Sequence, residues 1–382
     1  MTYSVYQHWD PLEVCVVGQS YPPEFYSWMK DAHVRTLFEK IAVETEEDYQ
    51  VIIAKLHEFG VEVLRPELPS AEDCFVNGKY LPPPMTPRDS MIIIGETFYE
   101  NYTVDIQSMY NNVRDSTWPE FTQINSINEL PDFAQQELRE LHHYDQFERF
   151  YSSYNKIYDR IQQQGNTIKS HFGNHKGAFQ APGAYISRIG QDLYFGTESY
   201  NINREEYKKF LDSEFTTHRN HIVNTGGHAD GVYCPVAPGL IISLRDVPTY
   251  ADTFPGWEVV YLPNQSWERI PEFNQLKHRN DGRWWIPGFE KDQSVIDTIE
   301  TWLGHWVGYV EETVFDVNML IIDPKNVIVF NYNEQVFEAL RRYGITPHVV
   351  PFRHRYFWDG GIHCITADLC RRGTKQDYFF KL

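Results

Sequence analysis

Apolar residues along the chain recur in paired short runs that are separated by turn residues. Residues 90–94 and 97–100 form the clearest pair, because β-branched and aromatic residues flank Gly95 on both sides. Such a pattern predicts a β-hairpin with glycine in the turn. A fifth and weaker candidate begins at residues 12–17. The three other pairs are residues 184–189 with 192–195, 231–236 with 240–244, and 319–322 with 327–330.

Amphipathic helical patterns lie between these hairpins, and each leads into a further strand. Residues 46–59 have a helical apolar period, with Thr45 as the expected N-cap, and Gly60 ends the helix before a strand at 61–64. Residues 334–352 repeat this order of helix and strand. The pattern predicts about five ββαβ modules in a closed or pseudo-symmetric α/β fold. Such repeats would share a centre, where hairpin ends could build a site.

A single domain over residues 1–382 is expected, because no Gly/Ser run, Pro tract or low-complexity block marks a boundary. Residues 101–146 interrupt the modules with a polar, Asn- and Gln-rich stretch, which we interpret as a surface insertion. Residues 146–164 follow a helical period whose aromatic stripe favours a place in the core.

The chain is acidic, with 34 Lys and Arg residues against 53 Asp and Glu residues and a formal net charge of −19. That balance argues against nucleic-acid and anionic-membrane partners, which need basic surfaces. It is compatible with a cationic small molecule, although acidity also serves solubility alone. No signal-peptide pattern and no run of about 18 apolar residues is present. The five cysteines form no CxxC pair, which favours free thiols and a cytoplasmic location.

The run at residues 359–366 carries the most distinctive chemistry, because a lone thiol, Cys364, follows a glycine pair and His363. Glycines such as Gly360 and Gly361 let the backbone approach a ligand closely. A cysteine in that setting becomes a nucleophile where nearby charge favours its thiolate. The alternative is a buried cysteine that acts as a small apolar residue.

Further candidate groups stand at the starts of predicted hairpins. Asp89 precedes one hairpin, and His228 with Asp230 precedes another. With Cys364 they suit attack by a thiolate on an electron-poor carbon beside a cation, where carboxylates hold the cation and an imidazole moves protons. A planar guanidinium fits such carboxylates. Each residue alone also has a structural explanation, as a turn cap for Asp89 and Asp230 and as a core histidine for His228.

A metal site is the competing interpretation of the histidines. His171 and His175 lie four residues apart, and His218 and His221 lie three apart. Such spacing serves a metal on a helix that has a third ligand, and Gly173 weakens a helix at the first pair. No HExxH motif is present. We therefore favour the thiol chemistry.

Taken in order, the motifs of the chain resemble those of the amidinotransferase family, which includes glycine amidinotransferase and inosamine-phosphate amidinotransferase. The resemblance spans nearly the whole chain outside residues 101–146. Each motif alone is weak, but together, in this order, the motifs are specific. The matching segments are residues 9–18, 60–66, 87–89, 228–230, 238–242, 318–320 and 360–368 with 371–373.

The resemblance implies a five-bladed, pseudo-symmetric α/β propeller of ββαβ modules, the pentein-type fold shared with arginine deiminases. It also implies a ping-pong reaction in which a thiolate attacks the guanidino carbon of arginine, ornithine leaves, and a primary amine takes the amidino group. By this match Cys364 is the nucleophile, His228 is the general acid–base, and Asp89 and Asp230 clamp the guanidinium. No metal or organic cofactor is implied, and a homodimer is the usual state in that family.

One position departs from the family pattern. The family has an aspartate behind the histidine, and this chain has Gln180 there. An amide can orient an imidazole but cannot stabilise an imidazolium by charge, and a comparable change in a Ser-His-Asp enzyme lowers kcat about 10⁴-fold. The hypothesis is that His228 has another carboxylate, is less basic than usual, or supports a slow or altered transfer. A rate for Gln180→Asp that is unchanged or lower would remove Gln180 as the limiting feature.

Substrate contacts are expected around the thiol and in the loop before His228. Residues 225–227 of that loop have little side-chain bulk, which predicts an acceptor amine larger than glycine. By the same match Gly361 and His363 are expected to contact substrate. Arg245 is a candidate for holding an α-carboxylate.

Two alternatives to amidino transfer stay open. Water could replace the amine, which would make the protein a guanidino-compound hydrolase on the same fold. A site impaired by Gln180 could instead bind a guanidino compound or a protein partner without catalysis. The joint presence of Cys364, His228, Asp89 and Asp230 argues against that last alternative.

Overall fold

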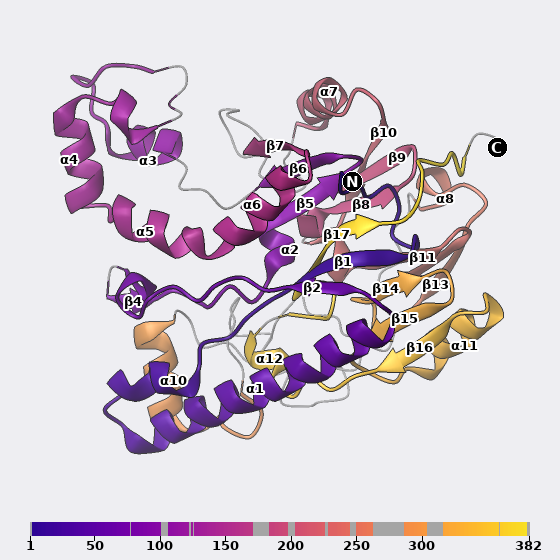
Figure 1. The fold of residues 1–382 in the computed structure, drawn as a ribbon, viewed down its shortest axis with the longest axis horizontal. Helices are drawn as coiled ribbons and strands as arrows, with labels where there is room; N and C mark the ends of the chain where they lie inside the picture. Colours follow the sequence, from indigo (N-terminus) through magenta and orange to yellow (C-terminus); the bar gives the residue numbers. More distant parts are fainter. Residues whose placement is uncertain are drawn as a thin grey trace.

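Sheets of one repeated pattern make up most of the β-structure in the computed structural model (Figure 1). The structure describes residues 2–76, 78–100, 106–121, 124, 126–170, 183–197, 203–225, 228–244, 250–262, 286–303, 316–358 and 360–379. In this part of the chain, five sheets each pair two strands antiparallel and add a third strand parallel to the second.

The strands of each sheet follow one another in the chain, apart from one sheet that combines both chain ends. A separate short ribbon pairs β3 (Phe75–Val76) with β4 (Lys79–Tyr80). The five sheets consist of β5 (Met91–Ile94), β6 (Thr97–Glu100) and β7 (Thr167–Ser170); β8 (Ile186–Ile189), β9 (Asp192–Thr197) and β10 (Arg219–Asn224); β11 (Tyr233–Ala237), β12 (Leu240–Ser243) and β13 (Glu258–Tyr261); β14 (Leu320–Asp323), β15 (Asn326–Val329) and β16 (Thr346–Val349); and β17 (Thr366–Arg371), β1 (Leu12–Val17) and β2 (Glu62–Leu64).

A helix lies between the second and third strands of each sheet, which confirms the predicted ββαβ modules. A crossover is needed there because a parallel strand cannot be reached by a tight turn. The length of this helix ranges from four residues in α8 to 27 in α1. The five helices are α1 (Ala32–Glu58), α6 (Asn155–Gln163), α7 (Arg204–Glu214), α8 (Tyr250–Thr253) and α11 (Glu334–Arg342).

The two ends of the chain share one module. The strand predicted at residues 12–17 is confirmed as β1, but its antiparallel partner is β17, with Val17 opposite Thr366. Figure 1 shows the indigo β1 beside the yellow β17. After β1 the chain enters η1 (Pro23–Trp28) and then α1, so no neighbouring strand is available to complete a hairpin.

Two hairpin turns behave as their glycines predict. Gly95 and Gly190 have φ of +60° and +63°, in the left-handed region that is costly for other residues. They join β5 to β6 and β8 to β9 in register, with Ile94 opposite Thr97 in the first pair.

The first long helix begins earlier than predicted. Asp31 is the N-cap of α1, and its side chain accepts from the backbone N–H groups of His33 and Val34. Thr45 is not a cap but a buried interior residue, whose hydroxyl donates to the carbonyl of Ile41 and accepts from Trp358 Nε1. Buried apolar positions continue through the helix on both sides of Thr45, so the acidic residues that follow it do not mark a first turn.

The stretch before β7 is helical but broken. The helical character predicted for 146–164 is confirmed, but the helix is not uniform: η4 (Ser152–Tyr154) separates α5 (Tyr144–Tyr151) from α6, and the carbonyl of Ser153 accepts from the backbone of Glu67. Before it, α3 (Ile106–Val113) and α4 (Asp132–Glu140) project from the sheets in Figure 1. They share a small apolar core of Ile106, Tyr110, Ile124, Ile127, Leu130, Ala134, Leu138 and Tyr144.

The remaining helical segments are short and several of them precede a strand. No helix within the described ranges is long and apolar enough to cross a membrane. The segments are η2 (Glu72–Cys74), α2 (Pro87–Ser90), η3 (Ile127–Glu129), η5 (Gly183–Tyr185), η6 (Ala229–Gly231), α10 (Gln293–Trp302) and α12 (Arg355–Trp358).

Candidate active site

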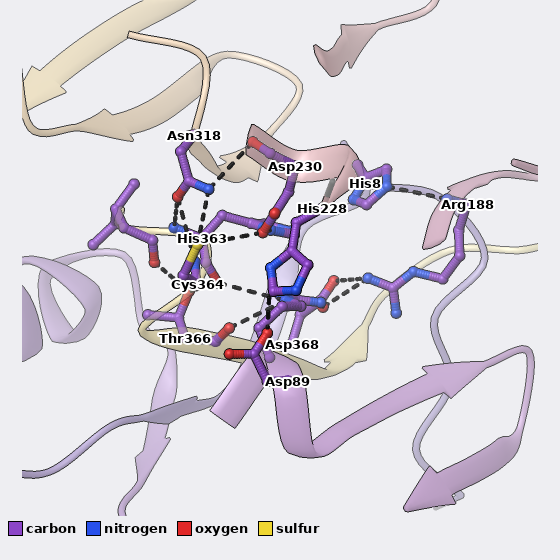
Figure 2. Close-up of polar contacts among 12 residues, drawn as sticks. His8, Asp89, Arg188, His228, Asp230, Asn318, His363, Cys364, Thr366 and Asp368 are labelled. Atoms are coloured by element: carbon purple, nitrogen blue, oxygen red, sulfur yellow. Dashed lines mark hydrogen bonds and ion pairs between the residues drawn. The ribbon is translucent and has the colours of Figure 1, made fainter. Parts of the chain in front are cut away.

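The segment that precedes the first strand of each module contributes a side chain to one cluster. α2 leads into β5, η5 into β8, η6 into β11, residues 316–319 into β14, and residues 360–365 into β17. Because the modules repeat, these segments occupy equivalent positions. Figure 2 shows that Asp89, Asp230, Asn318 and Cys364, from four of the segments, come together, and Tyr185 from η5 contacts His228. The side chains that they present are Asp89, Tyr185, Asp230, Asn318 and Cys364, and His228 lies just before η6.

Cys364 is buried, with 4% of its surface exposed, and its thiol lies between two polar groups. The Asn318 side-chain N–H donates to Cys364 Sγ at 3.1 Å, and Sγ lies 3.6 Å from Asp230 Oδ2. The same Asn318 also accepts from the backbone N–H groups of His363 and Cys364, at 2.7 and 3.3 Å. We call Cys364, Asp230, His363 and Asn318 the thiol cluster.

Asp230 is held as a carboxylate by its neighbours. Burial alone would raise the pKa of its carboxyl, but the hydrogen bond and charge of His363, with the charges of His228 and Arg88, lower that pKa overall. His363 donates from Nδ1 to Asp230 Oδ2 at 2.7 Å, whereas burial, with the charge of Arg88, lowers the pKa of His363. Asp230 Oδ1 is buried and accepts no hydrogen bond from the described residues.

His228 lies between an aromatic ring and a second carboxylate. Its Nδ1 is 3.7 Å from Asp89 Oδ1, and its ring meets the Tyr185 ring edge to face with centroids 4.6 Å apart. Figure 2 shows the imidazole in the region between Asp230 and Asp89. The side chains of His228 and Asp89 are 13% and 24% exposed, so this part of the site is the more open to solvent.

A second cluster of charges, the arginine cluster, adjoins the thiol cluster. It consists of Arg88, Arg188, Arg371 and Asp368, all at most 2% exposed. Asp368 accepts from Arg88 at 2.7 Å, from Arg188 at 2.7 and 2.8 Å, and from Arg371 at 2.6 Å. Burial would raise the pKa of Asp368, but the charges of these three arginines hold it well below the ordinary value.

Arg88 connects the two clusters. Its Nε donates to the backbone carbonyl of Thr366 at 3.2 Å, and its backbone N–H donates to the carbonyl of Cys364 at 3.4 Å. An internal cavity of about 20 Å³, lined by His8, Asp230, His363 and Arg371 among others, also borders both clusters. That volume holds about one water molecule and not a guanidinium.

The other cysteines lie in settings that disfavour a thiolate. Burial raises the pKa of Cys15 and of Cys234 to about 12 and that of Cys74 to about 11, and it also raises the pKa of Cys370. Cys364 is thus the cysteine that the fold brings together with an imidazole and two carboxylates.

The histidines of the competing metal interpretation do not form a cluster among the described residues, where no group of three or more His, Cys, Asp or Glu is placed to hold a metal ion. His221 instead bonds to Asp192 at 2.7 Å, and His218 contacts the hydroxyl of Thr217. His171 and His175 lie outside the described residues.

Of the other predicted site residues, some lie in the cluster and some cannot be placed. Gln180, Arg245 and residues 226–227 lie outside the described residues. Gly361 serves close packing, because a Cβ there would come within 2.3 Å of Asn318 Oδ1. His363 contacts Asp230.

Sequence reasoning misses several residues of the two clusters, and Tyr185 beside His228. Asn318 and Asp368 lie within the family-like motifs at 318–320 and 360–368, but nothing in their local pattern indicates a role. Arg188 and Tyr185 lie in a segment whose pattern predicts only a hairpin. Their signal is positional, since each lies just before or within the first strand of a module.

Comparison with known proteins identifies relatives at low identity, although no protein-family model matches the chain. The chain is 21% identical to inosamine-phosphate amidinotransferase 1 of Streptomyces glaucescens, over 99% of both chains. It is 22% identical to mitochondrial glycine amidinotransferase of Gallus gallus, over 98% of this chain and 84% of the relative. A match of 24% to L-arginine:L-lysine amidinotransferase of Pseudomonas savastanoi pv. phaseolicola covers 51% of this chain and only 45% of that relative.

Solved structures of two amidinotransferases have the same fold. Inosamine-phosphate amidinotransferase of Streptomyces griseus superimposes with a TM-score of 0.61, and an amidinotransferase of the saxitoxin pathway from Microseira wollei with 0.59. Both are 18% identical to this chain, and each match covers 99% of both chains. The expected pentein-type α/β fold is confirmed.

Proposed function

We propose that this chain, a divergent member of the amidinotransferases, transfers the amidino group of arginine to a primary amine through a covalent intermediate on Cys364, and releases ornithine. The observation that carries the proposal is the buried Asp230, whose Oδ1 accepts no hydrogen bond from the described residues and whose Oδ2 is 3.6 Å from the Cys364 thiol. A buried carboxylate oxygen is costly without a donor, and a guanidinium supplies one.

Asp230 is suited to hold the guanidinium beside the nucleophile. Its lowered pKa keeps it ionised, and the hydrogen bond from His363 fixes Oδ2 and thereby the orientation of Oδ1. A guanidinium bound at Oδ1 would bring its central carbon close to Sγ. The positive charge of the substrate would also favour the Cys364 thiolate, which otherwise faces a carboxylate.

The transfer then follows in two halves. Attack by the Cys364 thiolate forms a bond from Sγ to the guanidino carbon, and collapse of the adduct breaks the bond from that carbon to the nitrogen of the departing ornithine. His228 gives this nitrogen its proton. His228 next takes a proton from the incoming amine, which attacks the same carbon, and the bond from carbon to sulfur breaks to regenerate the thiolate.

We infer that Asp89 supplies the carboxylate that the family pattern places behind the histidine and that Gln180 does not provide. An imidazolium formed during proton transfer needs a nearby negative charge, and Asp89 Oδ1 lies 3.7 Å from His228 Nδ1. This geometry supports the hypothesis that His228 uses another carboxylate. We therefore assign Asp89 to His228 and leave Asp230 as the main partner of the guanidinium.

The relatives support this choice of substrates. One of them is named L-arginine:L-lysine amidinotransferase, and the others are named inosamine-phosphate amidinotransferase and glycine amidinotransferase. All of these names describe amidino transfer, which favours transfer over hydrolysis for this chain.

The test is incubation with arginine labelled at the guanidino carbon, with and without a panel of primary amines of increasing length. We expect ornithine to accumulate only when an amine is present, and intact-mass analysis to show one labelled amidino group on the protein. Cys370→Ser should keep the adduct and Cys364→Ser should lose it, because both are buried cysteines and only one adjoins Asp230.

Other outcomes would contradict the proposal in different ways. Citrulline or urea formed without an amine would identify a hydrolase. No adduct and no consumption of arginine would leave a protein that binds without catalysis.

A further inference from the structure

We propose that Asn318 is a further catalytic residue, whose side-chain amide stabilises the thiolate of Cys364. The inference rests on the proposed function, because it takes Cys364 as the nucleophile. Asn318 touches the reacting atom itself, with Nδ2 3.1 Å from Sγ (Figure 2). An N–H donor to a buried thiolate offsets part of the loss of hydration that the charged sulfur suffers.

The orientation of the Asn318 amide is fixed by its four contacts. Its Oδ1 accepts from the backbone N–H groups of His363 and Cys364, and its Nδ2 donates to the carbonyl of Asp230 as well as to Sγ. A rotation that exchanged oxygen and nitrogen would set two donors against the N–H groups and two acceptors against each other. The N–H group therefore points at the sulfur in a site where it cannot turn away.

The surrounding backbone is shaped to admit this amide. Gly361 passes so close that a Cβ would lie 2.3 Å from Asn318 Oδ1 and 2.6 Å from its Cβ. Any other residue at 361 would push the amide away from the thiol. Gly361 thus has a packing role beside Asn318, and its contact with substrate stays a prediction.

Several charged groups around Cys364 stay constant when Asn318 is changed. Asp230 faces the sulfur from η6, His363 bonds to that carboxylate, and Arg88 lies behind the loop on α2. Asp89 and His228 belong to the more open part of the site. A change in thiol acidity on altering Asn318 is therefore attributable to this position. In Asn318→Ala it reports the lost donor alone, and in Asn318→Asp it reports the lost donor together with an added negative charge.

The experiment measures the rate of alkylation of Cys364 by iodoacetamide as a function of pH, read by peptide mass, in the full chain without substrate. In Asn318→Asp the donor to sulfur is replaced by a negative charge of nearly the same shape. We expect the pH midpoint of alkylation to rise by about one unit or more, which is about a tenfold loss of thiolate at a pH below both midpoints. Asn203→Asp is the matched control, because Asn203 caps α7 and an aspartate caps equally well.

A second substitution, Gly361→Ala, disturbs the same contact between Asn318 and Cys364, so the test does not depend on one variant folding correctly. Gly361→Ala should raise the midpoint in the same direction as Asn318→Ala, and the double variant should add little, because both remove one interaction. Additive shifts would contradict the proposal.

The outcomes separate this inference from the proposed function. If Cys364 is alkylated in the unaltered protein but its midpoint is the same in Asn318→Asp, the role of Asn318 is wrong and the nucleophile stands. If Cys364 resists alkylation at every pH while the folded protein is intact, the nucleophile is wrong and both proposals fail.

Discussion

The thiol cluster and the arginine cluster adjoin each other where residues 360–365 lead into β17, yet they are built in opposite ways. In the arginine cluster, Asp368 accepts hydrogen bonds from all three guanidinium groups, at exposures of 2% or less. In the thiol cluster, Asp230 has one oxygen bonded to His363 and another without a partner among the described residues.

The contrast distinguishes a cluster that fixes the backbone around the site from one that has an oxygen available for a ligand. Arg88 and Asp89 are adjacent in the sequence but have different contacts. Arg88 donates to the backbone next to Cys364, whereas Asp89 lies beside His228. A saturated carboxylate has no capacity left for a ligand, whereas an unsaturated one gains free energy when a cation arrives. A carboxylate whose hydrogen bonds are complete thus adjoins one whose hydrogen bonds are not.

The largest expected effect is on catalysis by the thiol cluster, and it is lost if Cys364 is not needed for activity. We expect Cys364→Ser to lower kcat by about 10⁶-fold, the scale of removing a nucleophile from a catalytic set. The urea midpoint of unfolding should change little. Cys370→Ser, a buried thiol that contacts Glu13, should keep activity, and equal losses in both variants would contradict the assignment.

The arginine cluster should respond in stability instead. Asp368→Asn leaves three buried guanidinium groups without their counter-charge, which costs about 3–5 kcal/mol in the free energy of unfolding. Urea titration measures it. Glu62→Gln is the control, because its pair with Arg160 is exposed and worth at most about 1 kcal/mol. A loss of unfolding free energy as small as that of the control would show that the arginine cluster does not stabilise the backbone around residues 364–366.

Asp89 sharpens the comparison within the open part of the site. If Asp89 stabilises the His228 imidazolium, Asp89→Asn should lower kcat by about 10²- to 10³-fold, or about 3–4 kcal/mol, with KM for arginine little changed. If it clamps the guanidinium instead, KM should rise and kcat should stay closer to that of the unaltered protein. Steady-state kinetics distinguishes the two results.

The smallest effect concerns His8, which touches both clusters. Its Nε2 accepts from the backbone N–H of Arg188 at 3.1 Å, and its ring meets that of His363 with centroids 5.9 Å apart. Burial, with the charge of Arg188, holds the pKa of His8 well below 6.5. The unfolded chain therefore binds the proton first, so His8 lowers stability as pH falls below its unfolded pKa of about 6.5 and toward its folded value.

This pH effect can be isolated with a neutral replacement. Between pH 7 and 5.5, the free energy of unfolding of the unaltered protein should fall by about 1 kcal/mol more than that of His8→Gln. Urea midpoints at the two pH values measure the difference. Equal slopes would mean that His8 is not kept neutral by burial.

Much of the fold could be predicted because its signals are local. The turns at Gly95 and Gly190 need a left-handed residue, and the flanking β-branched runs need a sheet, so the hairpins follow from neighbouring residues. The start of α1 was missed because the acidic residues after Thr45 resemble a first turn, while the actual cap, Asp31, lies fourteen residues earlier. Only the burial of the intervening residues distinguishes the two.

The candidate site was predicted in part. The segments with Cys364, Asp230, His228 and Asp89 do meet, but their catalytic roles stay predictions. The role of Asn318 could not be predicted because it depends on a contact with Cys364, which lies 46 residues away in the chain.

The sequence by itself determined the repeated strand–turn–strand units, the helices that join them and the candidate nucleophile, because these depend on residues close together in the chain. The tertiary structure alone decided which groups face one another. It paired β1 with β17, set Arg88 against Asp368 across 280 residues, and brought the Asn318 amide to the Cys364 thiol. Such contacts follow from packing the modules around one centre, where each side chain is fixed by partners from other modules rather than by its own neighbours.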